Sequence, residues 1–398
     1  MSETTKASTK DYRKKRRLLF SLLPVVLIVL MLVMFVVVYY CGLFDSIIYA
    51  YNGKTYSIKA ISREQLSIHF LQMVNGANGD CIYIRAGDTD ILIDAGSKRD
   101  SAEYIGDYVD RFCTDGKLEY VIVTHADTDH LSGFVGTSAT PGIFDRYECE
   151  TIIQFARTNK NSQVYYDYCA KRNDEISKGA NCYTALECYR EINGAKRVYE
   201  LADGITMTVL YQEYYETYSE RENNYSVCLL FSQEYKKGGK TETNHYLLLG
   251  DLEKAGEQSL VKNNPDLPEV VLYKGSHHGS RTSSNNVLLS KIKPQIVCIC
   301  CVTGSVENTQ NVVNTFPSQS FINRISLYTD RIYATNIAIV DVDEETGEYV
   351  NVGCDALNGD IVCACTDGKV RMYFSNNDTK LCDTDWFAEN RVYPASWQ

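Results

Sequence analysis

The chain has 398 residues, which is enough for one large domain or two ordinary ones with an ample core. Its 40 Lys and Arg residues stand against 51 Asp and Glu residues, so the formal net charge is −11. Because residues 1–20 hold seven of the basic residues, the remainder is more acidic still, which argues against a broad surface for binding a phosphate backbone. An anionic substrate would have to be attracted by local charge, such as that of a bound metal ion.

The first candidate element is an uncharged, apolar run from Leu18 to Tyr40. At about 1.5 Å per residue, a helix over this run spans about 34 Å, which is enough to cross a bilayer with some tilt. The basic cluster Arg13–Arg17 precedes it, so the positive-inside rule places residues 1–17 in the cytoplasm and the rest outside the cell. A cleaved signal peptide is the alternative. The run is longer than a usual signal-peptide core and no small-x-small cleavage site follows, so we expect an uncleaved, single-pass anchor in the cell membrane.

The body of the chain reads as one α/β domain over residues 66–376, between a connector at 41–65 and a C-terminal extension at 377–398. Apolar alternation and runs of β-branched residues predict its strands. The predicted strands cover residues 66–71, 81–85, 91–94, 120–123, 205–210, 226–231 and 245–249, with a helix over 101–113. Residues 141–200 are rich in tyrosine and charge without a clear strand pattern, so we expect an insertion that caps or borders a site.

The 15 cysteines show no spacing typical of a disulfide framework, although an extracellular location would permit disulfides. The C-x-x-C of Cys298 to Cys301 lies inside the apolar run Ile296–Val302, where cysteine acts as a small core residue. We therefore expect no structural zinc on these thiols.

The run Thr124-His125-Ala126-Asp127-Thr128-Asp129-His130 follows the apolar residues Tyr120–Val123. Four potential metal ligands thus fall within six residues, directly after a buried strand. The sharp turn expected there allows the side chains to converge on one point. Imidazole and carboxylate at this density suit Zn²⁺, Mn²⁺ or Fe²⁺, and the two carboxylates favour the harder ions.

Two later strands also end in polar residues. Tyr246–Leu249 is followed by Gly250-Asp251, and one carboxylate can bridge two cations through its two oxygens. The second strand leads into Lys274-Gly275-Ser276-His277-His278-Gly279-Ser280. Adjacent histidines point apart, so we expect one of them to face a metal ion and the other to be free to contact a substrate.

Together these motifs resemble those of metallo-β-lactamase-fold hydrolases, and specifically the exported hydrolase domain of ComEC-type competence proteins. The other matching motifs are Gly79-Asp80, Leu92-Ile93-Asp94-Ala95-Gly96, Asn223-Asn224-Tyr225-Ser226, and Thr335, Gly359, Ile361 and Asp367-Gly368 near the C-terminus. The resemblance covers residues 66–374 and implies an αββα four-layer sandwich with a metal site at the sheet edge. The multi-span channel of the competence proteins has no counterpart in this sequence, so DNA uptake is not carried over.

The resemblance also implies a centre with two divalent metal ions, Zn²⁺ or Mn²⁺. The implied ligands are His125, Asp127, Asp129, His130, Asp251 and His277. One of the two metal positions would have only His125, Asp127 and Asp251, with Asn224 or a water molecule filling the remaining place. The implied catalytic residues are Asp129, which would orient the nucleophile or accept its proton, and Lys274 and His278, which would offset charge on the leaving side. Further residues expected to contact the substrate or to support the ligands are Asp80, Asp94, Asn223, Asn224 and Ser280.

The resemblance favours hydrolysis of a phosphodiester, in nucleic acid or in a cell-envelope phosphate ester, by metal-activated water. A β-lactam is a less favoured substrate, because the enzymes that cleave it use H-x-H-x-D-H sites that are richer in histidine. The alternative is a catalytically idle surface-binding module with the same fold. It is supported by Phe316, which stands where the family's N-x-x-H-P motif has histidine. No feature of the sequence predicts a protein partner.

Overall fold

The computed structural model describes residues 29–34 and 57–397. Lys54–Gln398 forms one compact unit, and Met1–Gly53 is a separate one in which residues 29–34 are helical. Most of the anchor predicted over residues 18–40 therefore lies outside the described residues, as do the basic tail at 1–17 and residues 41–56 of the connector. Among the helices that are described, none is both long enough and apolar enough to span a bilayer.

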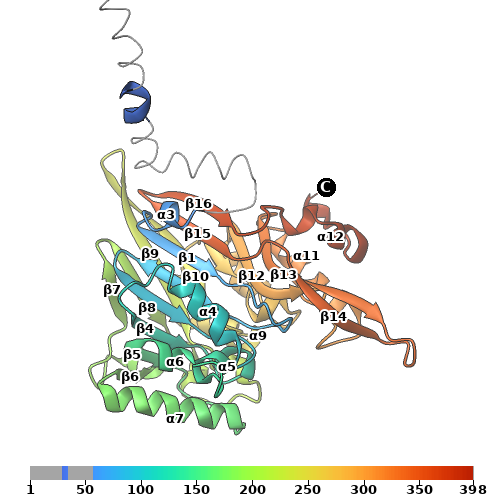
Figure 1. The fold of residues 1–398 in the computed structure, drawn as a ribbon, viewed down its shortest axis with the longest axis horizontal. Coiled ribbons are helices and arrows are strands. Elements are labelled where there is room, and N and C mark those ends of the chain that lie inside the picture. Colours follow the sequence, from blue (N-terminus) through green and yellow to red (C-terminus); the bar gives the residue numbers. More distant parts are fainter. Residues whose placement is uncertain (1–28, 35–56, 398) are drawn as a thin grey trace, which may run out of the picture. The chain divides into compact units, whose positions relative to one another are not determined.

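The domain is built on two eight-stranded sheets (Figure 1). In spatial order, the first sheet contains β16 (Lys369–Phe374), β15 (Ile361–Thr366), β1 (Leu66–Phe70), β2 (Ile82–Ala86), β3 (Thr89–Ile93), β4 (Lys117–Val123), β5 (Glu148–Gln154) and β6 (Asn181–Thr184). The second sheet contains β14 (Tyr349–Ala356), β13 (Ile332–Val342), β12 (Ile296–Thr303), β11 (Leu272–Lys274), β10 (Lys240–Leu248), β9 (Cys228–Lys237), β8 (Ile205–Leu210) and β7 (Val198–Ala202).

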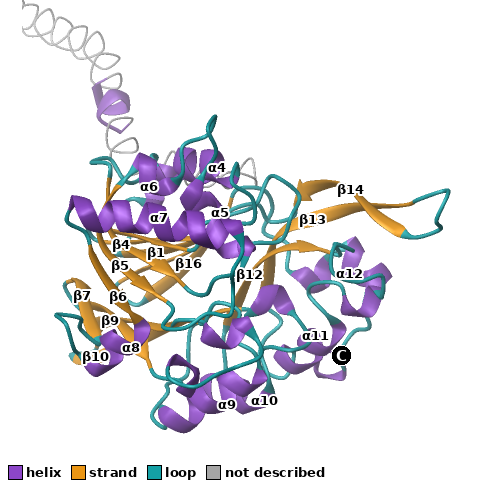
Figure 2. Cartoon of the chain, turned by 90° about the horizontal axis from the view of Figure 1, so that it is seen from below, coloured by secondary structure: helices purple, strands orange, loops and turns teal. Residues whose placement is uncertain are grey.

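Helices cover the outer faces of both sheets (Figure 2). The helices of the first half of the domain are α3 (Ile58–Ile61), α4 (Ser101–Val109), α5 (Thr128–Val135), α6 (Ile143–Arg146), α7 (Gln163–Lys178) and α8 (Ala185–Arg190). Those of the second half are α9 (Lys254–Asn263), α10 (Asn286–Ile292), α11 (Gln319–Ile325) and α12 (Asp385–Asn390).

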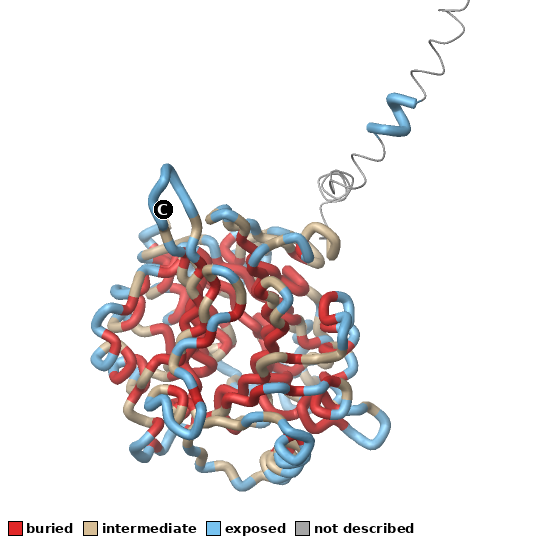
Figure 3. Tube along the Cα trace, turned by 90° about the vertical axis from the view of Figure 1, so that its left-hand side faces the viewer, coloured by how far each residue is buried: buried red, intermediate tan, exposed pale blue. Residues whose placement is uncertain are grey.

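Three apolar cores lie between the layers. Alternate side chains of a strand point to opposite faces of its sheet, so each sheet contributes to a core on either side. In β1, Leu66, Ile68 and Phe70 belong to the core between the two sheets. A second core joins the first sheet to α4, α5, α6 and α7, and a third joins the second sheet to α9, α10, α11 and α12. Figure 3 shows the buried backbone concentrated at the centre of the domain. The mixed α/β fold with two large sheets agrees with the expected metallo-β-lactamase architecture, with the order helix, sheet, sheet, helix.

Residues 141–200, in which the sequence shows no clear strand pattern, contribute strands to both sheets. They contain β5 and β6, which extend the first sheet by parallel pairing onto β4, and the start of the second sheet at β7. In β5 the charged Glu148 and Glu150 face solvent while Cys149 and Ile152 are buried, and these glutamates obscured the strand pattern. Among the tyrosines of this stretch, Tyr168 on α7 is fully buried and packs in the core, whereas Tyr166 is 54% exposed.

The described cysteines are all free thiols, so the structure contains no disulfide within residues 57–397. Cys298, Cys300 and Cys301 are buried in β12, as the apolar run predicted. Their role as core residues is confirmed.

Candidate metal centre

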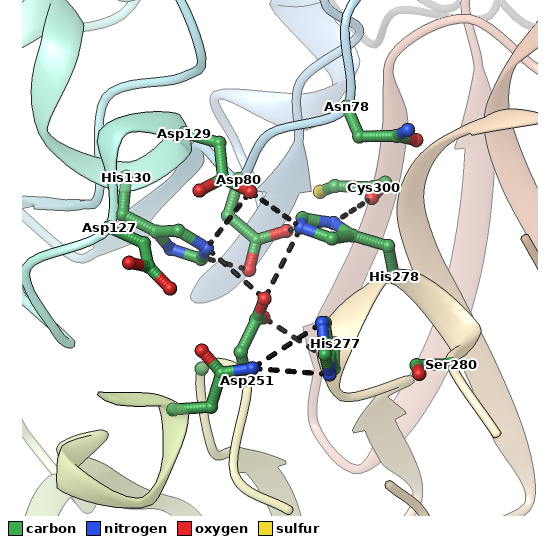
Figure 4. A network of polar contacts seen from close by, with 12 residues as sticks. Asn78, Asp80, Asp127, Asp129, His130, Asp251, His277, His278, Ser280 and Cys300 are labelled. Atoms are coloured by element: carbon green, nitrogen blue, oxygen red, sulfur yellow. Dashed lines mark hydrogen bonds and ion pairs between the residues drawn. The ribbon is translucent and has the colours of Figure 1, made fainter. Parts of the chain in front are cut away.

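The site is built where parallel strands of the two sheets end. β3, β4 and β5 are mutually parallel in the first sheet, and so are β10, β11 and β12 in the second. Asp94 follows β3, the run Thr124–His130 follows β4, Gly250-Asp251 follows β10, and His277-His278 comes shortly after β11. Ligands in α/β folds characteristically bind outside the carboxyl ends of such strands. Motifs that are far apart in the sequence therefore meet at one place (Figure 4).

Four side chains converge closely enough to hold one metal ion, and one donor atom from each lies within 4.8 Å of the others. These four, called the tetrad below, are Asp129, His130, Asp251 and His278. Oδ2 of Asp251 is 3.3 Å from Nε2 of His130 and 3.3 Å from Nε2 of His278. Nε2 of His278 also lies 3.1 Å from Oδ2 of Asp129. The Asp129 side chain is 35% exposed while the other three are buried, so the tetrad opens to solvent at Asp129.

His130 is held in the orientation that a ligand needs. Its Nδ1 lies 2.7 Å from Oδ2 of Asp94, and Asp94 in turn accepts hydrogen bonds from the backbone N–H and the hydroxyl of Thr124 at 2.8 and 2.6 Å. With Nδ1 donating to a carboxylate, the ring exposes the Nε2 lone pair to the tetrad. The structure thus places Asp94 directly behind a candidate ligand, one of the two positions expected for it.

His278, and not His277, completes the tetrad. Nδ1 of His278 donates to the carbonyl of Cys300 at 2.8 Å, which leaves Nε2 facing Asp129 and Asp251. The neighbouring ring of His277 lies apart from this point in Figure 4, with its Nδ1 3.1 Å from the hydroxyl of Thr282. The sequence assigned the metal to His277 and the leaving side to His278. The structure places His278, and not His277, among the clustered donors.

Asp251 presents one oxygen to the tetrad while its other oxygen is fixed from behind. Oδ1 of Asp251 accepts from the backbone N–H of His277 at 3.2 Å and from Nζ of Lys274 at 3.1 Å. Gly250 precedes it with φ of +53°, where a Cβ atom would lie 2.8 Å from the Cβ of Thr124. Only glycine allows this turn, which brings the carboxylate beside the H-x-D-x-D-H run.

Lys274 lies behind the tetrad and does not face a substrate. Its side chain is 1% exposed, and Nζ donates to the carbonyl of Gly250 at 2.8 Å and to Asp251, and forms an ion pair with Asp80. An ammonium group has three N–H donors, and these three acceptors account for them. The expected role of Lys274 on the leaving side does not fit this placement. Its charge instead compensates two buried carboxylates, Asp80 and Asp251.

The charges around the tetrad favour a bound cation, as the pKa shifts of its histidines and of Asp251 indicate. Burial lowers the pKa of His130, but the carboxylates of Asp251 and Asp94 outweigh this and hold its pKa well above the usual value. Burial likewise lowers the pKa of His278, which Asp251 and Asp80 raise well above its usual range. Burial raises the pKa of Asp251, yet the neighbouring positive groups, chiefly His278 and Lys274, hold it well below its usual range. The carboxylates therefore demand positive charge at both Nε2 atoms.

These residues fit one divalent cation. A lone pair on Nε2 that faces a carboxylate oxygen is unfavourable unless a proton or a metal ion lies between them. Within residues 57–397, the Nε2 atom of His130 is one of the buried side-chain atoms without a hydrogen-bond partner. Two imidazoles and two carboxylates are a donor set that Zn²⁺ and Mn²⁺ both accept.

The second metal position implied by the resemblance has few donor groups. Nε2 of His125 lies 3.4 Å from Oδ2 of Asp127, but neither residue joins any group of three or more close donors in the described part of the chain. Asn224 is buried and does not supply the missing ligand: its Oδ1 accepts from the backbone N–H of Gly256 at 3.1 Å, and its Nδ2 donates to Ser219 at 3.2 Å.

The remaining predicted residues lie around the tetrad. Asn223 donates from Nδ2 toward the ring of His277, at 3.3 Å from Nδ1, and toward Glu253 at 3.4 Å. The Ser280 hydroxyl lies 3.0 Å from that of Thr282, outside the tetrad. Phe316 packs its ring 5.9 Å from those of both His277 and His278, so an aromatic wall stands beside the two histidines.

Two contributors had no signal in the sequence. The carbonyl of Cys300, inside β12, orients His278, and main-chain groups leave no mark in a motif. Lys160 lies in the loop between β5 and α7 and pairs with Asp127. The rest of α5, the helix α6 and the strand β5 separate it from the H-x-D-x-D-H run, so neither spacing nor periodicity connects the two.

The comparisons with known proteins address the fold. A family model for the metallo-beta-lactamase superfamily matches residues 74–138, which include the turn at Asp80, Asp94 and the whole H-x-D-x-D-H run. Over this segment the chain is similar to the metallo-β-lactamase superfamily. A search of curated proteins finds no match. The finer resemblance to ComEC-type proteins stays a prediction.

Solved structures similar to this chain include metallo-β-lactamases and an RNase Z. MEM-A1, a subclass B3 metallo-β-lactamase from a soil metagenome library, is 12% identical with a TM-score of 0.29, over 52% of this chain and 75% of that one. BJP-1 of Bradyrhizobium japonicum is 14% identical with a TM-score of 0.26, over 49% and 70%. The long form of yeast RNase Z is 8% identical with a TM-score of 0.35, over 73% of this chain and 41% of that one. These values are too low to transfer an activity to this chain.

Proposed function

We propose that this chain is a metal-dependent hydrolase of phosphodiester bonds, with Asp129, His130, Asp251 and His278 as its metal ligands. One observation carries the proposal. The rings of His130 and His278 are each fixed through Nδ1, by Asp94 and by the Cys300 carbonyl, so that both Nε2 atoms face the same carboxylate of Asp251. A bound divalent cation would supply Lewis-acid polarisation of the scissile ester and activation of a water molecule.

The chain's own residues would bind the cation, orient the substrate and receive protons. Asp129 is the exposed member of the tetrad, so its carboxylate is placed to orient the attacking water and accept its proton. His277, with its side chain 22% exposed beside Asn223, is placed to hydrogen-bond a phosphate oxygen. Lys274 and Asp80 would hold Asp251 in place without touching the substrate.

The phosphodiester as substrate rests on the motif set and on the balance of ligands. The H-x-D-x-D-H run with Gly-Asp and K-x-x-H-H-G-S resembles the motif set of the ComEC-type hydrolase domains. A tetrad of two carboxylates and two imidazoles suits hard ions such as Mn²⁺, which bind phosphate oxygens well. The acidic body does not prevent this, because the cation cancels repulsion locally.

We also propose that the enzyme is held at the outer face of the cell membrane by a helix over residues 18–40. The support is the sequence alone: an uncharged apolar run preceded by five consecutive basic residues. Nucleic acid or a cell-envelope phosphate ester would then be the substrates within reach.

An idle binding module is the competing function, and one observation favours it. Phe316 places an aromatic ring beside His277 and His278 where the family pattern has a histidine, which removes one polar group from the substrate side. Both functions need the fold, and only the hydrolase needs turnover.

The deciding experiment measures hydrolysis of bis-p-nitrophenyl phosphate by the full-length chain in detergent, with Mn²⁺ or Zn²⁺ added to metal-stripped protein. We expect turnover that requires the metal and that Asp251→Asn abolishes. His245→Gln is the matched control, because it removes a histidine of β10 that lies outside the tetrad. Metal binding without turnover would support the idle module, and absence of metal binding would contradict both the tetrad and the hydrolase.

A further inference from the structure

The loop between β5 and α7 is fastened beside the metal centre by a buried glutamate. Oε1 of Glu222 accepts from the hydroxyl of Thr158 at 2.6 Å and from the backbone N–H of Ala126 at 3.3 Å. Its Oε2 accepts from the backbone N–H of Asn159 at 2.7 Å. One carboxylate thus ties this loop to the H-x-D-x-D-H run, and residue 160 is held at a fixed place next to that run.

Lys160 uses this position to reach Asp127. Its backbone N–H donates to the Thr158 hydroxyl at 2.9 Å, and its ammonium pairs with Oδ1 of Asp127. The other oxygen of Asp127 faces Nε2 of His125 at 3.4 Å. The carboxylate of Asp127 is therefore shared between an imidazole and a lysine, at the position where the family pattern has the first of its two metal ions.

A cation bound there would meet two obstacles. The first is the ammonium of Lys160, which occupies one oxygen of Asp127 and would repel a divalent ion close to it. The second is the shortage of donors. Asn224 is committed to Gly256 and Ser219, and Oδ1 of Asp251 is held from behind by Lys274, so only His125 and Asp127 remain. The tetrad has neither obstacle, since its own lysine, Lys274, lies behind Asp251.

We propose that the ammonium of Lys160 takes the place of the first metal ion, so that the centre holds one divalent ion in the tetrad and one lysine at Asp127. This inference rests on the metal centre proposed above and differs from the two metal ions that the resemblance implies. The Lys160 side chain is 39% exposed, so its charge is also accessible to an anionic substrate at the mouth of the site. The substrate would then meet a metal ion on one side and an ammonium on the other.

The test is the number of Mn²⁺ ions bound per chain, measured by equilibrium dialysis of the full-length protein in detergent followed by elemental analysis. We expect one ion for the unmodified chain. Lys160→Glu exchanges the ammonium for a carboxylate donor beside Asp127, so we expect two. Lys160→Gln removes the charge without adding a carboxylate, and we expect a second, weaker ion at high Mn²⁺.

Lys171→Glu is the matched control. It makes the same charge change on α7, where Lys171 pairs with Asp145, and we expect it to leave one ion bound. Two ions on the unmodified chain would overturn the inference while leaving the proposed hydrolase intact. One ion in both Lys160 variants, with thermal unfolding showing that they are folded, would also overturn it. No ion on the unmodified chain would overturn the tetrad itself.

Discussion

Nδ1 of His130 lies 2.7 Å from Oδ2 of Asp94, and this contact directs the other ring nitrogen, Nε2, toward the metal centre. Asp94 is buried at the end of β3 with φ of +57°, fixed by two hydrogen bonds from Thr124. A carboxylate behind a ligating histidine sets its tautomer and its orientation. The affinity of the tetrad is therefore expected to depend on a residue that does not contact the metal.

Asp94→Asn tests this dependence, because it keeps the shape of the side chain and removes its charge. We expect the affinity for Mn²⁺ or Zn²⁺ to fall about 10–100-fold, as is usual for loss of a group that supports a ligand. Isothermal titration calorimetry measures the change directly. Asp88→Asn, on the exposed hairpin turn between β2 and β3, is the control. Equal affinities for the two variants would contradict the role given to Asp94.

His277→Gln and His278→Gln separate the two neighbouring histidines. Nε2 of His278 faces both Asp129 and Asp251, so we expect its loss to weaken metal binding by more than the about 10–100-fold typical of a supporting residue. His277 contacts Asn223 and Thr282 instead, so its variant is expected to keep the metal and to raise KM for a phosphodiester. Loss of the metal in the His277 variant alone would restore the assignment that the sequence favoured.

Lys274→Met tests the buried charge compensation. Removing the ammonium leaves the carboxylates of Asp80 and Asp251 uncompensated in the interior, which is expected to lower the free energy of unfolding by about 3–5 kcal/mol. Adding Asp80→Asn to this variant removes one of the two stranded charges, so the double variant should be more stable than Lys274→Met. Urea unfolding of the metal-free proteins checks both. A double variant less stable than the single one would contradict the pairing.

His69 predicts how stability depends on pH away from the site. It is fully buried on β1, where Nδ1 lies 2.8 Å from the Tyr108 hydroxyl, and burial lowers its pKa from 6.5 to about 3. Below pH 6.5 the unfolded chain takes up a proton that the folded chain does not. This residue therefore removes stability as pH falls from 6.5 toward 3, by about 3 kcal/mol at pH 4.

The measurement is the free energy of unfolding in urea at pH 7 and at pH 4. His69→Gln does not titrate in this range, so we expect its loss of stability between the two pH values to be smaller than that of the unmodified chain by about 3 kcal/mol. Tyr108→Phe removes a partner of the ring and keeps the titrating group, so its pH dependence should match the unmodified chain. The same pH dependence in the His69 variant would show that the ring is not held neutral.

Much of the fold could be predicted from the sequence, because a strand with one or two buried faces has an apolar pattern that can be recognised in the sequence. The strands expected at 66–71 and 205–210 correspond to β1 (Leu66–Phe70) and β8 (Ile205–Leu210). β5 and β6 could not be predicted. The exposed positions of β5 carry charge, and β6 is only four residues long with none of them fully buried. Parallel pairing onto β4 stabilises them, and that contact is invisible to a local pattern.

In the site, the motifs could be predicted but the directions of the side chains could not. His277 and His278 both have positive φ, at 51° and 53°, so neither helical nor strand periodicity indicates which ring turns inward. The burial of Lys274 and the reach of Lys160 depend on the packing of segments distant in the chain. From the sequence alone, Lys274 is interpreted as a substrate contact, because its burial is visible only in the structure.

The most direct test of the account is anomalous X-ray diffraction from crystals of the protein grown with Mn²⁺ or Zn²⁺. The predicted result is a single anomalous peak within coordination distance of Asp129, His130, Asp251 and His278, with the ring of His277 outside that distance. A peak ligated by His277 instead of His278, or no peak at the tetrad in crystals that hold the metal elsewhere, would contradict the central claim.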